Sequence, residues 1–257
     1  MTNINELQKK YASDNFVSVT TDVDWASEDC IKELLDFFLE RNIPLTVFCT
    51  HKSKMIDRYK KNPLITLGIH PNFCENSSQG KSYDEVIKYC TEIVPDAISF
   101  RCHRWFDTND IYDKLVPKGF LYESNSSSLM CNVPPYIHRS GILRIPVFFE
   151  DGGYIFHNPD MRFESSGRKY FDAPGLKVLD LHPIHFAVNT PYFTYTREIK
   201  DRLTREEYNC LDKDAVQKIR NNKRGIRTYI EEMTGFILSE KINVVSLPQI
   251  YKDLKQI

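Results

Sequence analysis

Four short groups of polar residues in this chain have the types and spacing that metal-assisted acid–base chemistry needs. They are Asp22-Val-Asp24, His70-Pro-Asn-Phe-Cys74, Arg101-Cys-His103 and Asp180-Leu-His182-Pro-Ile-His185. Carboxylates and imidazoles bind divalent metals, and both can move protons near neutral pH. Each group ends or directly follows an apolar segment, which indicates that buried strands present these side chains at their ends.

The first group offers two carboxylates on one side of the chain. Alternate residues of an extended segment point the same way, so Asp22 and Asp24 can share one site. One carboxylate could bind a metal while the other accepts a proton. The plain alternative is a solvated turn, because Asp is common after strands.

The second and third groups offer further ligands. His70 directly follows an apolar run and is a candidate metal ligand through an imidazole nitrogen. Cys74 could bind as a thiolate, although we favour a small buried apolar role for it. Arg101 can hold a carboxylate through a bidentate pair. His103 can complete a metal shell or bind substrate, and an ordinary ion pair with a packed imidazole is the alternative for this group.

The fourth group suits a general acid. Asp180 and His182 are two residues apart in a predicted strand, so we expect them on the same face. A carboxylate there would orient His182 and raise its pKa. We expect His185 to have a lesser role, as a cap of the loop.

Apolar runs and helical patterns alternate along the chain, which predicts a parallel sheet covered by helices. Expected strands are 16–21, 44–49, 64–69, 97–100, 142–149, 177–181 and 243–245, and a long helix is expected over 214–240. Ser27 is a good N-cap, and Ser82 with Glu85 forms a capping-box pattern. About seven parallel strands suit an open or closed barrel, whose site lies at the carboxyl ends of the strands. The Ser-, Asn- and Pro-rich segment 124–139 and the segment 158–175 are expected to be long loops beside it.

Bulk composition sets the outer limits of the function. The chain has 257 residues, 41% hydrophobic and 27% charged, with a net charge of −1. That charge argues against a nucleic-acid binder, which needs clustered Lys and Arg. The seven cysteines form no CxxC pair, and we find neither a signal peptide nor an apolar window of about 18 residues. We therefore expect a cytoplasmic protein without a membrane span.

Taken in order, these motifs resemble those of the polysaccharide deacetylase superfamily (NodB-homology, carbohydrate esterase 4-like). The matching segments are Thr20-Thr-Asp22-Val-Asp24, Gly68-Ile-His70, Phe100-Arg101-Cys-His103 and Leu179-Asp-Leu-His182. The sequences His-Pro-Asn-Phe and His-Pro-Ile-His are similar to a divergent branch, the WbmS-like deacetylases of surface-polysaccharide clusters. The resemblance implies an α/β fold, a distorted or open (β/α)7-type barrel, with residues 1–257 as a single catalytic domain.

The resemblance also implies residue roles. Asp22 would be the catalytic base, oriented by Arg101. Asp151 would be the acid that holds this arginine, and His182 would be the general acid. Asp24 would bind the metal.

The implied metal site departs from the family pattern at two positions. His70 matches the family's metal-binding histidine, but Cys74 stands where a second histidine is usual. His103 replaces a residue of the usual Arg-x-Pro-Tyr motif, and we infer that it supplies the missing ligand. The expected ligands of one divalent ion, with zinc as the expected metal, are therefore Asp24, His70 and His103. Whether His103 or Cys74 is the third ligand stays open at this stage.

The implied enzyme is a metal-dependent hydrolase that removes an N-acyl group, with acetyl expected, from an amino sugar of polysaccharide or glycoconjugate biosynthesis. A cytoplasmic location favours a nucleotide-linked or lipid-linked sugar as the substrate.

Two alternatives remain. A glycosyltransferase could use Asp22-Val-Asp24 to hold a metal and a nucleotide sugar, but it leaves His70 and His182 without a role. A catalytically silent sugar-binding relative is the other.

Overall fold

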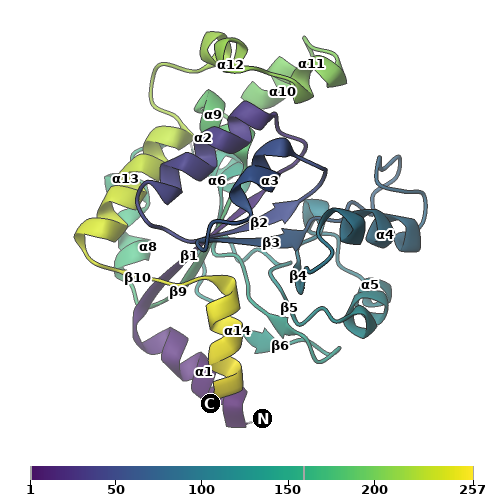
Figure 1. Cartoon of the computed structure of the whole chain (residues 1–257). Helices are drawn as coiled ribbons and strands as arrows, with labels where there is room; N and C mark the ends of the chain where they lie inside the picture. The colour runs from purple at the N-terminus through teal and green to yellow at the C-terminus, as the bar shows by residue number, and fades with distance from the viewer. Residues whose placement is uncertain (1, 159, 257) are drawn as a thin grey trace.

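A curled, mostly parallel sheet forms the centre of the protein (Figure 1). The structure is a computed structural model that describes residues 2–158 and 160–256. Over these residues ten strands make one sheet: β1 (Asn15–Asp22), β2 (Leu45–Cys49), β3 (Ile65–Ile69), β4 (Ser99–Phe100), β5 (Tyr122–Glu123), β6 (Tyr136–Ile137), β7 (Leu143–Arg144), β8 (Phe149–Glu150), β9 (Gly175–Leu181) and β10 (Asn243–Val244). The order is β6-β7-β5-β4-β3-β2-β1-β9-β8, with β10 beside β1, and among the pairs formed by the described residues only β6–β7 is antiparallel. The open, distorted barrel expected from the sequence is confirmed.

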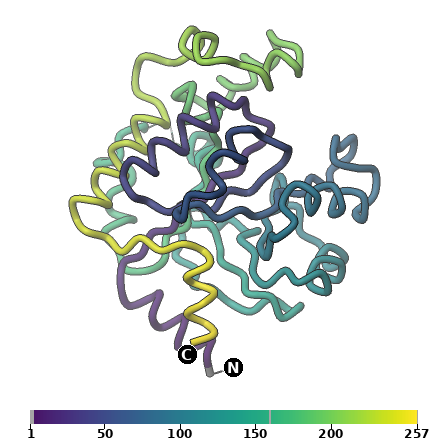
Figure 2. Tube along the Cα trace, viewed as in Figure 1, coloured from purple at the N-terminus to yellow at the C-terminus, as the bar shows by residue number. Residues whose placement is uncertain are grey.

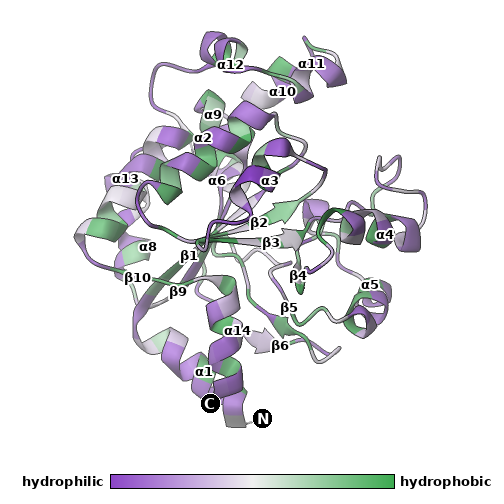
Figure 3. Ribbon diagram, in the orientation of Figure 1, coloured by the Kyte–Doolittle hydropathy of each residue, from purple (hydrophilic) through white to green (hydrophobic). Residues whose placement is uncertain are grey.

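Helices cover the outside of this sheet (Figure 1). They are α1 (Thr2–Ser13), α2 (Glu28–Leu39), α3 (Lys54–Tyr59), α4 (Tyr83–Ile93), α5 (Asn109–Leu115), α6 (Asp151–His157), α7 (Phe163–Ser166), α8 (Arg168–Asp172), α9 (Pro183–Val188), α10 (Tyr195–Lys200), α11 (Arg205–Asn209), α12 (Lys213–Ile219), α13 (Ile226–Ser239) and α14 (Leu247–Gln256), with short 3₁₀ turns η1 (His103–Trp105) and η2 (Val116–Lys118). Figure 3 shows hydrophobic and hydrophilic residues alternating along α2 and α13, as amphipathic helices require. The expected caps are present, because Ser27 accepts from the Cys30 N–H and Ser82 forms a capping box with Glu85.

Side chains alternate between the two faces of each strand, and this alternation decides which of them reach the barrel interior. In β1, Val17 and Val19 belong to the apolar core shared with the outer helices, so the alternate residues Ser18, Thr20 and Asp22 face inward. The interior cluster includes Phe48 of β2 and Val178 of β9, among others. Asp22, at the end of β1, therefore points into the mouth of the barrel.

Two expected elements are interrupted in the structure. The prediction of one strand over 142–149 was wrong. This segment contains two strands, β7, which pairs with β5, and β8, which pairs with β9. Pro146 lies between them and cannot donate a ladder hydrogen bond, so the chain leaves one pairing and starts another there.

The prediction of a single helix over 214–240 was also wrong. Helix α12 ends at Ile219, and a separate helix, α13, begins at Ile226. Between them, Asn189 donates from its side-chain amide to the carbonyls of Asn221 and Lys223. These bonds hold the connection as a loop. The segment expected to be a loop over 158–175 contains α7 and α8.

The two ends of the chain close the bottom of the barrel. Figure 2 shows the first and last segments running side by side. The Tyr11 hydroxyl of α1 donates to Asp253 of α14 at 2.7 Å, and Lys10 Nζ lies 2.5 Å from the same carboxylate. Across residues 2–158 and 160–256, no helix combines the length and the apolar character that crossing a bilayer would require.

Candidate active site

The expected site residues gather at the carboxyl edge of the sheet. Asp22 ends β1, and the β1–β9 register places Thr20 beside Asp180. His70 follows β3, whose last residue Ile69 pairs with Phe100 at the end of β4. Because parallel strands end at the same edge, residues far apart in sequence converge there.

Arg101 is the centre of the buried polar network. Its side chain is 0% exposed, and Nη1 donates to Asp22 Oδ1 at 3.0 Å. The same nitrogen lies 2.7 Å from Asp180 Oδ1. Nε donates to the Ser124 carbonyl at 2.6 Å and Nη2 to the Ser124 hydroxyl at 2.9 Å. These contacts fix the guanidinium, which in turn fixes the orientation of the Asp22 carboxylate.

The acid that pairs with this arginine differs from the expectation. Asp180 contacts Arg101, whereas Asp151 was expected to hold it and does not. Burial, with the nearby charge of Asp22, raises the pKa of Asp180 well above its usual range despite the arginine beside it. Asp180 thus lines the floor of the site behind Asp22.

Asp151 instead holds His182. Its Oδ1 accepts from His182 Nδ1 at 2.6 Å, and its Oδ2 accepts from the His182 backbone N–H at 2.7 Å. Asp180 was expected to be this partner, and that expectation was wrong. Burial alone would lower the pKa of His182, but the ion pair and hydrogen bond with Asp151 raise it well above its usual range. Because Nδ1 is committed to Asp151, Nε2 is the nitrogen that faces the site, 3.6 Å from Asp24 Oδ2.

Asp24, His70 and His103 form a group whose potential ligand atoms all lie within 4.8 Å of one another. Asp24 Oδ1 lies 2.9 Å from His103 Nδ1 and 3.1 Å from His70 Nε2. Burial would raise the pKa of Asp24, but its contacts with His103 and His70 hold it well below its usual range. Asp24 has a positive φ of 45°, in the left-handed region, and its carboxylate faces the two histidines.

The residues present fit a bound divalent cation. His70 is 1% exposed, yet within the described residues neither of its ring nitrogens has a hydrogen-bond partner of good geometry. A buried imidazole without such partners is unfavourable unless something else binds it. One carboxylate and two imidazoles are a donor set that suits zinc. Among the described residues, Cys74 is in no such group.

Sequence comparison assigns the family. A model described as "WbmS-like: Polysaccharide deacetylase" matches residues 19–199. This chain belongs to the WbmS-like polysaccharide deacetylase family. No protein of curated function matches it in sequence.

Solved structures share the fold of this polysaccharide deacetylase. A protein of Bordetella bronchiseptica, assigned as a polysaccharide deacetylase involved in O-antigen biosynthesis, is 23% identical, with a TM-score of 0.75; the match covers 86% of this chain and 90% of that one. A protein of Mycobacterium smegmatis assigned as a polysaccharide deacetylase is 16% identical, with a TM-score of 0.51, over 94% of this chain and 91% of that one.

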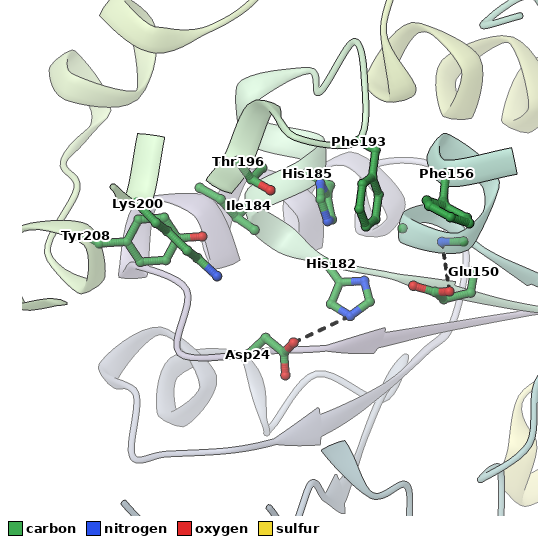
Figure 4. Close-up of a pocket in the computed structure, with 12 residues that line it drawn as sticks. Asp24, Glu150, Phe156, His182, Ile184, His185, Phe193, Thr196, Lys200 and Tyr208 are labelled. Atoms are coloured by element: carbon green, nitrogen blue, oxygen red, sulfur yellow. Dashed lines mark hydrogen bonds and ion pairs between the residues drawn. The ribbon is translucent and has the colours of Figure 1, made fainter. Parts of the chain in front are cut away.

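Two neighbouring cavities open at the site of this deacetylase. A small cavity of about 140 Å³ is lined by the catalytic candidates, including Asp22, His70 and His182. A larger one of about 450 Å³ begins at Asp24 and His182 and extends between α6 and α10 (Figure 4). The two share Asp24, Glu150 and His182 in their lining, so they adjoin and form one larger binding space.

Glu150 is a residue of the site that the sequence analysis missed. Glu150 lines both cavities, and burial raises its pKa. Its carboxylate accepts from the Gly153 N–H at 2.8 Å, as drawn in Figure 4, and a Cβ at Gly152 or Gly153 would lie 2.6 Å from that carboxylate. The pair of glycines after Glu150-Asp151 could have suggested this close approach.

His185 has more than the capping role expected for it. It joins Asp151 and His182 in a second potential ligand group, and its Nδ1 lies 3.0 Å from the Thr190 hydroxyl. Burial lowers the pKa of His185 to about 4, so it is neutral near pH 7.

Proposed function

We propose that this deacetylase is a metal-dependent hydrolase that removes an N-acyl group, acetyl in the simplest case, from an amino sugar. Residues 1–257 would act as one catalytic domain. The observation that carries the proposal is the meeting of three units in one small cavity. These are the Asp24–His70–His103 group, the Arg101-held Asp22 carboxylate and the Asp151-held His182 imidazole.

Asp24, His70 and His103 would hold the cation, with zinc favoured by their oxygen and nitrogen donors. When bound, such an ion lowers the pKa of water and polarises a carbonyl group. Cys74 stays outside this proposal, because it is in no ligand group of the described residues.

Asp22 is proposed as the general base. Arg101 donates to Oδ1, so Oδ2 is left to face the site, 3.6 Å from His70 Nδ1. A carboxylate held on one oxygen keeps the other oriented toward a water that attacks the acyl carbon. Arg101 is therefore proposed as a positioning residue, supported from behind by Ser124 and Asp180.

His182 is proposed as the general acid. Asp151 accepts from Nδ1, which leaves Nε2 to donate its proton to the departing amine. The raised pKa of His182 favours the protonated form near neutral pH, and that form is the one able to donate. Asp151 is a positioning residue in this scheme, and its role is to orient His182 and keep it charged.

The proposed location is a reducing compartment, the cytoplasm, since all seven cysteines are free thiols and four of them are buried. There the substrate would be a nucleotide-linked or lipid-linked amino sugar. A glycosyltransferase would not need the His182–Asp151 pair, so we do not propose it.

The test is release of acetate or formate from N-acylated amino sugars by the purified protein, before and after chelation, with metal content measured by elemental analysis. We expect release that chelation abolishes and a divalent ion restores. Sugar transfer to an acceptor without acid release would contradict the hydrolase, and full metal loading without release from any probe would indicate a silent relative.

A further inference from the structure

The larger cavity beside the catalytic candidates has two different walls. One wall carries the exposed rings of Phe156 and Phe193, whose centroids are 4.7 Å apart. The other wall is formed by Lys200 at the end of α10 and Tyr208 of α11, with His182 between the walls (Figure 4). The family match ends at residue 199, so it assigns no role to Lys200 or Tyr208.

Lys200 places an ammonium group in this cavity without a carboxylate partner. Its Nζ lies 4.8 Å from the centroid of the Tyr208 ring, and no ion pair to Lys200 is found in the part of the chain that the structure describes. Arg197, one turn earlier, is instead paired with Asp201 at 2.8 Å. In Figure 4 the Lys200 side chain extends past Tyr208 toward the side of the cavity where Asp24 lies.

Lys200 is an exposed residue, so its ammonium can reach a ligand in the open part of this cavity. Partial desolvation by the surrounding protein lowers the pKa of Lys200, and the charge of Asp24 offsets part of that effect. An exposed ammonium gains modestly from an anion, so the subsite depends on its position beside Tyr208.

Tyr208 supplies a second, independent observation. Its side chain is buried, at 6% exposed, and within the described residues its hydroxyl has no hydrogen-bond partner. A buried hydroxyl without a partner is uncommon and needs an explanation, such as a ligand. Burial raises the pKa of Tyr208, so the group is a neutral donor near pH 7. Figure 4 shows the hydroxyl beside Lys200 on the cavity side of the ring.

Carboxylates lie on the same cavity, and they restrict where an anion can bind. Asp24 faces His70, His103 and His182, and Glu150 caps the start of α6 beneath the phenylalanine wall. Asp24 lies toward the Lys200 and Tyr208 wall, but its contacts with the three histidines offset its charge, so an anion at that wall can still pair with the Lys200 ammonium.

We propose that Lys200 and Tyr208 form a subsite for an anionic group, a phosphate or a carboxylate, carried by the amino-sugar substrate. This deepens the proposed function, on which it rests. The amide would be placed beside His182 while the anionic group pairs with the ammonium and accepts from the tyrosine hydroxyl. The enzyme would therefore prefer a charged amino sugar to a neutral one.

The test compares three probes: N-acetylglucosamine, N-acetylglucosamine 1-phosphate and N-acetylglucosaminuronic acid. Acetate release is measured for wild type, Lys200→Gln, Lys200→Arg, Tyr208→Phe and the control Lys218→Gln. Lys218 is an exposed lysine of α12 away from the cavity. We expect wild type to prefer one or both anionic probes. Lys200→Gln should lower kcat/KM for that probe about 2- to 5-fold, the usual effect of losing an ion pair with an exposed ammonium, with little change for the neutral probe. Lys200→Arg should retain the preference, Tyr208→Phe should weaken it, and Lys218→Gln should leave it unchanged.

The same probes are titrated calorimetrically into chelator-treated protein, so that binding is read without catalysis. Tighter binding of an anionic probe that is lost in Lys200→Gln supports the subsite even if no acetate is released, in which case only the proposed function fails. Preference for the phosphate or for the uronic acid identifies which anion the subsite takes. Two results would overturn the subsite. One is that wild type binds and deacetylates neutral and anionic probes equally well. The other is that Lys200→Gln lowers kcat/KM and affinity by the same factor for all probes.

Discussion

Replacing Asp151 with Asn tests the proposed acid most directly. Asp151 accepts two hydrogen bonds from His182, one from Nδ1 at 2.6 Å and one from the backbone N–H at 2.7 Å. An Asn amide has one acceptor oxygen, so one of these donors loses its partner and faces an NH₂ group. The substitution also removes the negative charge that outweighs burial in raising the pKa of His182. Asp151→Asn should therefore lower that pKa.

The size and direction of the effect on activity follow from this contact. A general acid is active when protonated, so the rate falls as pH rises through the pKa of His182. Lowering the pKa moves this alkaline limb to lower pH. An adjacent carboxylate shifts a pKa by about 1–3 units, and the protonated fraction above both pKa values changes tenfold per unit. We expect a limb displaced by about 1–3 pH units and a rate about 10- to 1,000-fold lower on its alkaline side. The buried donor left without an acceptor should cost about 1–3 kcal/mol in the free energy of unfolding.

The assay is a pH–rate profile of acetate release for wild type, Asp151→Asn and Asp180→Asn. Asp180→Asn is a matched control, because both carboxylates are 0% exposed and both lie near His182. Asp180 contacts Arg101 rather than His182, so its replacement should move the alkaline limb less. Any bound cation is common to wild type and the variants, so its effect on His182 should largely cancel in the difference.

Three results would refute this reasoning. One is an unchanged alkaline limb in a folded Asp151→Asn protein, with folding checked by circular dichroism and thermal unfolding. Another is a larger displacement in Asp180→Asn than in Asp151→Asn. The third is a limb that moves to higher pH.

The remaining predictions concern the metal and the base. One divalent ion should co-purify, and Asp24→Ala or His70→Ala should each strongly lower its content; full metal content in His70→Ala, by elemental analysis, would rule out the site. Asp22→Asn should keep the metal and lose about a hundredfold or more in turnover, the usual effect of removing a general base; a rate near that of wild type would falsify the role of Asp22. Cys74→Ser should leave metal content largely unchanged, and a large loss of metal affinity would make Cys74 the third ligand in place of His103.

The sequence predicted the fold class and the meeting place of the site because both depend on local patterns. Apolar runs mark buried strands, and the polar residues after parallel strands converge at one edge. Asp22, His70 and Arg101 were placed in this way, and in the structure Asp22 lies beside both Arg101 and His70. The curvature of the sheet could not be predicted from the sequence. Arg101 follows β4 and Asp22 ends β1, with β3 and β2 between these strands in the sheet order, and only curvature lets their side chains meet at 3.0 Å.

The cavity beyond the catalytic candidates was not predictable either. Lys200 and Tyr208 lie in short helices between β9 and α13, with no apolar period or motif that marks them. Their importance arises from where these helices lie beside the cavity, because an exposed lysine in a polar helix has no feature in the sequence that separates it from other solvated lysines. Only the structure reveals that its ammonium lies over a buried tyrosine beside His182.

Asp151 contacts His182 and Asp180 contacts Arg101, the reverse of the expected pairing. The expectation used alternation within one strand, which does not describe the pairing between strands. Alternation within β9 puts Asp180 on the interior face with Val178, which is where Arg101 enters. His182 lies past the last residue of β9 and starts α9, so strand alternation no longer sets its direction. The register between strands decides instead: Glu150 of β8 pairs with Asp180, which brings Asp151, one residue further on, next to the His182 N–H. Base and acid therefore have separate carboxylate partners, Asp180 behind Arg101 and Asp22, and Asp151 behind His182. Since each partner contacts one catalytic candidate more directly than the other, the pKa of the proposed acid can be changed through Asp151 while the orientation of the proposed base is kept.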